Sequence, residues 1–95
     1  MEEVDTVKLF NYYEIIKDFN RLRIIFCIYD KLLTIEQISK ETKLSNISIK
    51  HQLEYLISKD IIKKEEIKKE VYYKIKNKEL IKIIDNDKKF INEFR

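Results

Sequence analysis

The chain contains no glycine, proline or tryptophan, and no alanine. Without glycine it lacks the flexible loops that hold phosphate groups or form oxyanion sites in many enzymes. The four missing residues have GC-rich codons, whereas isoleucine, lysine and asparagine are abundant. The composition therefore indicates an AT-rich genome and by itself points to no function.

Cysteine and histidine occur once each, as Cys27 and His51. A single cysteine cannot form an internal disulfide, and one that lies between Phe26 and Ile28 is expected to be an inert core thiol; a disulfide between two protomers is the alternative. Catalysis at His51 would need a nucleophile, an acid or a metal nearby. A helix there offers only Ser48 and Tyr55, so we expect neither catalytic residues nor enzyme activity.

Long apolar runs are also missing. No run reaches the roughly 18 residues that a membrane span needs, and the acidic N-terminus lacks the basic and apolar regions of a signal peptide. We therefore expect a cytoplasmic protein that does not bind a membrane. Residues 1–95 should form one domain, and a chain this short would gain stability from dimerisation.

The net charge of +3 is unevenly distributed. Residues 1–19 carry five acidic residues and two lysines, a net charge of −3, whereas residues 43–76 carry nine lysines and five acidic residues, a net charge of +4. A basic middle segment suits a polyanion such as DNA. A solvated lysine-rich surface is the alternative interpretation.

Two helices are predicted before residue 32. Residues 4–18 place apolar side chains three or four positions apart, which is helical spacing. Residues 20–31 are apolar nearly all round, which is typical of a central core helix.

Two shorter helices follow, joined by a tight turn. The sequence TIEQ, which begins at Thr34, is a capping box that starts a helix, and Ser45 caps the next helix, residues 46–58. Between them, we expect Lys43 to take the positive φ that glycine often supplies. Residues 34–58 therefore predict a helix-turn-helix.

The pattern changes at residues 61–76, where IIKKEEI and VYYKIK are β-branched and aromatic runs that predict a two-stranded hairpin. The intervening KKE has no glycine or asparagine, so we expect a loop longer and looser than a two-residue turn. Tyr72 and Tyr73 should point to opposite faces, one of them into the core. Residues 78–94 return to helical spacing. The sequence thus predicts a mainly α protein with a small β-hairpin, in the order α-α-α-α-β-β-α of a winged helix-turn-helix.

Three segments between Asn20 and Ile84 resemble the ArsR-type (ArsR/SmtB) bacterial repressors: NRLRIIFCIY, TIEQISKETKLSNISIKHQLEYL and DIIKKEEIKKEVYYKI. The resemblance implies a homodimer in which helices 4–18 and 78–94 pack together. Both helices have apolar stripes without an obvious partner, although packing within their own domain is the alternative. The expected interface residues are Val7, Phe10, Tyr13, Ile16, Ile83, Phe90, Ile91 and Phe94.

The sequence departs from this family at the wing, in the recognition helix and at the metal sites. The wing lacks its usual glycine, and Gln52 takes the place of a usual histidine, with His51 one position earlier. Thr34, Ile35 and Glu36 replace the family's metal-binding CVC pattern and supply no thiolate. The last helix has acidic residues but no histidine. We therefore predict no metal site and no cofactor.

The resemblance also implies that residues 46–58 enter the major groove of DNA. Asparagine and glutamine can pair with adenine, lysine with guanine, and Ile47 can contact a thymine methyl group. The expected base-reading residues are Asn46, Ile47, Ser48, Lys50, His51 and Gln52. The expected phosphate contacts are Ser45, Lys64, Lys68 and Lys69. The partner would be double-stranded DNA with a palindromic, AT-rich site.

We therefore predict a sequence-specific transcriptional regulator, a dimeric ArsR-like repressor without the usual metal site. Two alternatives remain open at this point. One is a plasmid or phage partition protein, a winged helix that binds centromere repeats. The other is a winged-helix protein-interaction module whose acidic first helix meets a basic partner.

Overall fold

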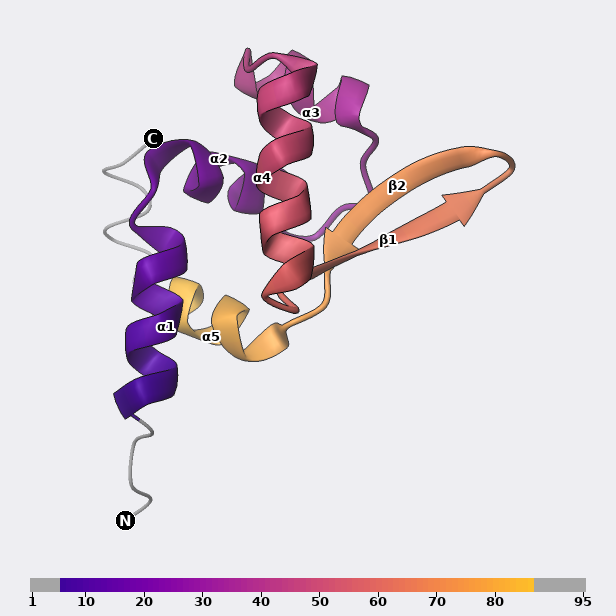
Figure 1. The fold of residues 1–95 in the computed structure, drawn as a ribbon. Helices are drawn as coiled ribbons and strands as arrows, with labels where there is room; N and C mark the ends of the chain where they lie inside the picture. Colours follow the sequence, from indigo (N-terminus) through magenta and orange to yellow (C-terminus); the bar gives the residue numbers. More distant parts are fainter. Residues whose placement is uncertain (1–5, 87–95) are drawn as a thin grey trace.

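The computed structural model describes residues 6–86 of the chain (Figure 1). Its elements are α1 (Thr6–Ile16), α2 (Phe19–Cys27), α3 (Ile35–Thr42), α4 (Asn46–Ser58), β1 (Ile62–Ile67), β2 (Glu70–Ile75) and α5 (Lys78–Asn86). The predicted order of four helices, a hairpin and a helix is confirmed, although α1 ends at Ile16 rather than residue 18 and α2 ends at Cys27 rather than residue 31. Three predicted interface residues lie outside the described residues: Phe90, Ile91 and Phe94.

The core is built around α2, as its apolar character predicts. Ile24, Ile25 and Ile28, which follows the last residue of α2, are fully buried. Side chains from the surrounding elements complete one continuous cluster. Its fully or nearly fully buried members outside α2 include Ile38, Ile49, Leu53, Leu56, Ile61, Ile62 and Leu80.

The turn between α3 and α4 has the predicted local chemistry. The Gln37 backbone N–H donates to Thr34 Oγ1 at 3.2 Å, and the Thr34 N–H donates to Gln37 Oε1 at 2.9 Å, which completes the capping box. Ser45 Oγ accepts the N–H of Ser48 at 3.1 Å. Lys43 ends α3 with a φ of 64°, the left-handed conformation expected of it. These caps fix where α4 begins.

The first and last described helices touch within one protomer. Lys8 Nζ lies 2.7 Å from Glu79 Oε2. The Tyr12 hydroxyl donates to the same carboxylate at 3.3 Å and accepts from Asn77 Nδ2 at 3.0 Å. The start of α5 is therefore held against the inner face of α1, as Figure 1 shows.

The hairpin corrects one sequence prediction. β1 and β2 are antiparallel, with Ile62 opposite Ile75 and Ile67 opposite Glu70, so only Lys68 and Lys69 form the loop. Both have positive φ, 50° and 70°, as a type I′ turn requires at its two central residues. The predicted longer, looser loop is wrong, because two lysines adopt the left-handed conformation and strand pairing continues to the turn.

The same register explains the two tyrosines. Tyr73 is buried and exchanges backbone hydrogen bonds with Leu33, which lies just before α3, at 2.7 and 3.1 Å. Tyr72 is half-buried on the opposite face, where its hydroxyl donates to Glu70 at 3.1 Å. The predicted alternation is confirmed, and the bridge from Leu33 ties the wing to the helix-turn-helix.

The strained turn yields a prediction about stability. Replacing both lysines, Lys68→Asn with Lys69→Gly, should raise the free energy of unfolding by about 1 kcal/mol, because these residues adopt positive φ with less strain. Urea denaturation would measure the change. The control, Lys68→Gln with Lys69→Gln, removes the same charges but keeps the strain and should not stabilise. Equal stability of the two double variants would contradict the prediction.

Candidate nucleic-acid interface

One face of α4 is buried and the opposite face is open to solvent. Ile49, Leu53 and Leu56 point into the core. The exposed side chains from Asn46 to Glu54 define what we call the α4 strip. The α4 strip consists of Asn46, Ile47, Lys50, His51 and Glu54.

The α4 strip contains four of the six residues predicted to read bases. Ile47 is 84% exposed although it is apolar. Within the described residues, no side-chain hydrogen bond or ion pair engages Asn46, Lys50 or His51. Their polar groups are therefore available to a ligand without breaking a contact in that part of the chain.

Ser48 and Gln52 lie elsewhere on the helix. Both are half-buried at the edge of α4. Gln52 Oε1 accepts a hydrogen bond from Arg21 Nε of α2 at 3.0 Å. The carboxamide oxygen of Gln52 is thus engaged inside the protein, whereas no hydrogen bond within the described residues uses its NH₂ group.

Glu54 is a strip residue that the sequence analysis did not select. It lies four residues after Lys50, so the two share one helical face. Burial and, to a lesser extent, the charge of Glu54 raise the pKa of Tyr73 on β2. Glu54 therefore lies where α4 meets the hairpin. Its spacing from Lys50 was the signal that could have identified it.

The wing projects from the end of α4 away from the helical body (Figure 1). Lys64, Lys68 and Lys69 are exposed, and no ion pair within the described residues involves them. Lys63, on β1, is exposed and unpaired in the same way, whereas Lys74 lies 3.6 Å from Glu65 and Lys76 lies 2.6 Å from Asp60. The lysines predicted to contact phosphate are thus unpaired in this part of the chain. Ser45, at the exposed start of α4, instead uses its hydroxyl oxygen to cap the helix.

The predicted interface residues on α1 fall into two groups. Val7, Phe10 and Tyr13 are 69%, 61% and 49% exposed. Ile16, and Ile83 on α5, are instead half-buried against the core. The outer face of α1 is therefore apolar and uncovered in a single protomer.

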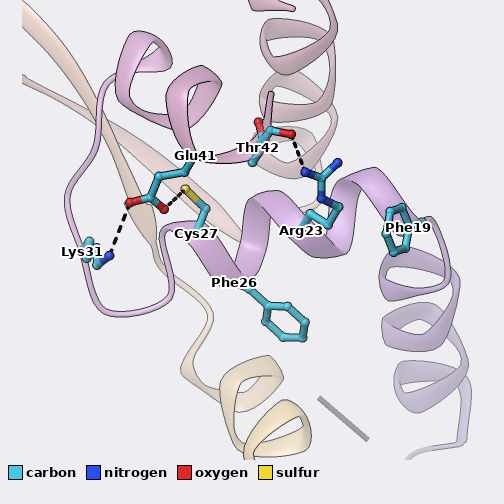
Figure 2. A pocket seen from close by; sticks show the side chains of 7 residues that line it. All are labelled: Phe19, Arg23, Phe26, Cys27, Lys31, Glu41 and Thr42. Atoms are coloured by element: carbon cyan, nitrogen blue, oxygen red, sulfur yellow. Dashed lines mark hydrogen bonds and ion pairs between the residues drawn. The ribbon is translucent and has the colours of Figure 1, made fainter. Parts of the chain in front are cut away.

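Figure 2 shows a pocket of about 670 Å³ between α2 and α3. Its lining residues are Phe19, Arg23, Phe26, Cys27, Lys31, Glu41 and Thr42. The charged groups have partners: Arg23 donates to the Thr42 carbonyl, and Lys31 Nζ lies 3.6 Å from Glu41. Cys27 Sγ donates to Glu41 Oε2 at 2.9 Å.

Cys27 is a protonated thiol at neutral pH. Burial, followed by the hydrogen bond to Glu41 and the charge of that carboxylate, raises the pKa of Cys27 to about 12. The same hydrogen bond, with Lys31 nearby, lowers the pKa of Glu41. The thiolate is the nucleophile and the metal-binding form, so Cys27 is poorly suited to either role.

Two further observations concern metals and membranes. Within residues 6–86, no three histidine, cysteine, aspartate or glutamate side chains gather closely enough to hold a metal ion. None of the helices in this range combines the length and the apolar character needed to cross a membrane.

The protected thiol gives a pH prediction. At pH 8, iodoacetamide should alkylate Cys27 in the folded protein about a thousandfold more slowly than in urea, since three pKa units separate the folded thiol from an ordinary one. Because the pKa of Cys27 is higher in the folded protein than in the unfolded one, the protonated thiol adds to the free energy of unfolding. This contribution is fully present below about pH 9 and is lost as the pH rises toward 12. Glu41→Gln should speed alkylation, whereas Glu36→Gln, on the same helix, should not. Equal rates in folded and unfolded protein would refute this protection.

No family model matches the chain, and no curated protein matches it in sequence. Solved structures do match. The transcriptional regulator HlyU from Vibrio vulnificus CMCP6 aligns with a TM-score of 0.83 and 17% identity over 90% of each chain. The transcriptional repressor BigR from Xylella fastidiosa aligns with a TM-score of 0.78 and 11% identity over 85% of this chain and 80% of its own.

A third similar structure is a homodimer. It is the winged helix-turn-helix DNA-binding domain of Mb0332 from Mycobacterium bovis, described as a possible ArsR-family transcriptional regulator. It aligns with a TM-score of 0.71 and 14% identity over 97% of this chain and 89% of its own. The chain therefore has the winged helix-turn-helix fold of the ArsR/SmtB-type regulators that its sequence resembles.

Proposed function

We propose that the protein is a sequence-specific, DNA-binding transcriptional regulator that acts as a homodimeric repressor in the cytoplasm. The observation that carries the proposal is the α4 strip. It is a row of polar, basic and apolar side chains that points outward from a helix held firmly by its other face. The similar structures are transcriptional regulators or repressors, which supports the same function and does not favour a partition protein or a protein-interaction module.

The α4 strip has the chemistry for reading the major groove. Lys50 can donate to guanine O6 and N7, and Asn46 can pair with adenine. Ile47 can pack on a thymine methyl group, and Glu54 can accept from a cytosine amino group. His51 can donate or accept. Because asparagine and isoleucine favour A·T pairs, we propose an AT-rich site.

Gln52 and Ser48 have smaller roles in this proposal. Each lies at the edge of the α4 strip, and the carboxamide oxygen of Gln52 is engaged by Arg21. A bidentate contact with adenine needs both the oxygen and the NH₂ group. Because Arg21 already fixes the direction of this carboxamide, we expect Gln52 to offer its NH₂ group to the groove rather than a bidentate contact.

The proposed phosphate contacts come from the ends of the motif. Ser45 lies at the N-terminus of α4, where free N–H groups favour anions. Lys64, Lys68 and Lys69 lie along the wing. Such contacts hold the protein in register on the duplex and add affinity, but they do not select a sequence.

The proposed dimer uses the outer face of α1. Val7, Phe10 and Tyr13 recur every three residues, and burying them would remove apolar surface from water. Ile16 and Ile83 would support this face from the core side. The proposed interface also includes Phe90, Ile91 and Phe94, which lie outside the described residues. A two-fold dimer predicts a palindromic site with half-sites about one helical turn apart.

Two sets of substitutions test the DNA interface after random-site selection has identified the preferred sequence. Lys50→Ala should weaken binding by roughly 1–3 kcal/mol at particular base pairs. Lys68→Ala with Lys69→Ala should weaken binding to every sequence and reduce the logarithmic salt slope of the dimer by about four, two for each protomer. Fluorescence anisotropy on single-base variants of the site, at several salt concentrations, separates the two effects. A uniform loss for Lys50→Ala would remove its base-reading role.

A single charged substitution on the outer face of α1 tests the proposed dimer interface. Phe10→Asp should raise the dissociation constant of the dimer at least tenfold, because the carboxylate would be desolvated between two apolar faces. Sedimentation velocity at several concentrations would measure it. Asn11→Asp adds a comparable charge to the neighbouring position, off the apolar row, and should leave the dimer intact. If Phe10→Asp sediments like the wild type, the interface lies elsewhere.

A further inference from the structure

We propose that Arg21 is a positioning residue that fixes the DNA-reading helix α4 relative to the proposed dimer helix α1. This inference rests on the proposed function, since it concerns how the α4 strip is held for base reading. Arg21 lies on α2, its side chain is only 15% exposed, and its guanidinium contacts two other helices.

The first set of contacts caps α1. Arg21 Nη1 donates to the carbonyl of Ile15 at 3.1 Å and approaches that of Glu14 at 3.4 Å. Both carbonyls lie in the last turn of α1, where backbone oxygens lack partners within the helix. A cation there also complements the negative end of the helix dipole. Arg21 therefore holds the C-terminal end of the helix that carries the outer apolar face.

The second set of contacts holds α4. Arg21 Nε donates to Gln52 Oε1 at 3.0 Å, and its guanidinium carbon lies 3.9 Å from the centre of the Tyr55 ring. Gln52 and Tyr55 are three residues apart on α4 and so share one helical face. The guanidinium is thus held by the hydrogen bond to Gln52 at its edge and by the Tyr55 ring packed against its face.

The orientation of Arg21 is itself constrained. Its guanidinium Nη2 lies 3.9 Å from Oδ2 of Asp18, the residue that caps α2 by accepting the Arg21 backbone N–H at Oδ1. Lysine cannot replace this arrangement, because its ammonium group is a compact charge without a planar fork of donors or a face that stacks on an aromatic ring. A lysine at position 21 would keep the charge and lose the simultaneous contacts to α1 and α4.

The consequence for DNA binding is selective. Hydrogen bonds to base edges weaken steeply with small changes in distance or angle, so they depend on the orientation of α4. Contacts from long wing lysines to phosphates tolerate such changes, because these side chains are flexible. Losing the Arg21 contacts should therefore reduce discrimination between sequences and leave general affinity for duplex DNA in place.

The same geometry assigns Gln52 a role in positioning. Its oxygen accepts a hydrogen bond from Arg21. Substitutions at position 52 that break this bond should therefore change the orientation of α4 and weaken recognition of several base pairs rather than one. Gln52→Glu keeps an acceptor for Arg21, whereas Gln52→Met removes it. These two variants test the contact from the α4 side, independently of whether an Arg21 variant folds well.

The experiment measures a specificity ratio, the dissociation constant for scrambled duplex divided by that for the selected site. We expect Arg21→Lys and Gln52→Met each to lower this ratio at least tenfold, with the loss spread over several base pairs. The double variant should be no worse than Arg21→Lys alone, since Arg21→Lys already breaks the contact that Gln52→Met removes. Gln52→Glu, which keeps the acceptor and loses only the NH₂ donor, should lower the ratio less than Gln52→Met and at no more than one base pair.

Control measurements separate positioning from folding. All variants are assayed well below their unfolding temperatures, where a lower melting temperature alone changes no binding ratio. Affinity for scrambled duplex and its salt slope should stay unchanged for Arg21→Lys, as should dimerisation in sedimentation.

Three results would overturn the inference. The first is a specificity ratio for Arg21→Lys equal to that of the wild type. The second is a double variant whose loss of specificity equals the sum of the two single losses. The third is a Gln52→Met loss confined to a single base pair, which would make Gln52 a base reader. A wild-type protein that binds no duplex DNA would instead overturn the proposed function, and the role of Arg21 with it.

Discussion

The structure depends on the burial of one short helix. The core side chains of α2 are fully or almost fully buried, and a helix that is apolar nearly all round must be covered on nearly every side. Helices α1, α3, α4 and α5 supply that cover, and the hairpin closes the remaining edge through Ile62 and Tyr73. The side of α4 that we propose to face DNA is exposed because its other side completes this core.

The polar residues of α2 then fix the orientation of its neighbours. Arg21 reaches α1 and α4, Arg23 reaches the end of α3 through the Thr42 carbonyl, and Cys27 reaches α3 through Glu41. Apolar burial is non-directional, so it can place a helix without fixing its rotation. Directional hydrogen bonds fix the rotation of each helix. The proposed regulator function relies on both, since base reading needs a helix that is held both firmly and at the correct angle.

Much of this arrangement could be predicted from local chemistry. The capping box at Thr34, the Ser45 cap and the positive φ of Lys43 depend on residues within a few positions of one another. The start of α4 was therefore predicted to the residue. The hairpin turn was predicted wrongly for a related reason. Local preference disfavours two lysines at positive φ, but the cross-strand pairing of Ile62 with Ile75 through Ile67 with Glu70 leaves no residues for a longer loop.

The sequence by itself determined that α4 has a buried face and a polar face, because helical periodicity alone assigns Ile49, Leu53 and Leu56 to one side. It could not decide the fate of residues at the edge between the two faces. Gln52 was assigned to the groove, yet its oxygen is held by Arg21, which lies 31 residues earlier in the chain. Glu54 was overlooked, yet it faces outward beside Lys50. Only the tertiary structure decided these cases, because a side chain at a helix edge turns toward whichever partner the rest of the fold brings near.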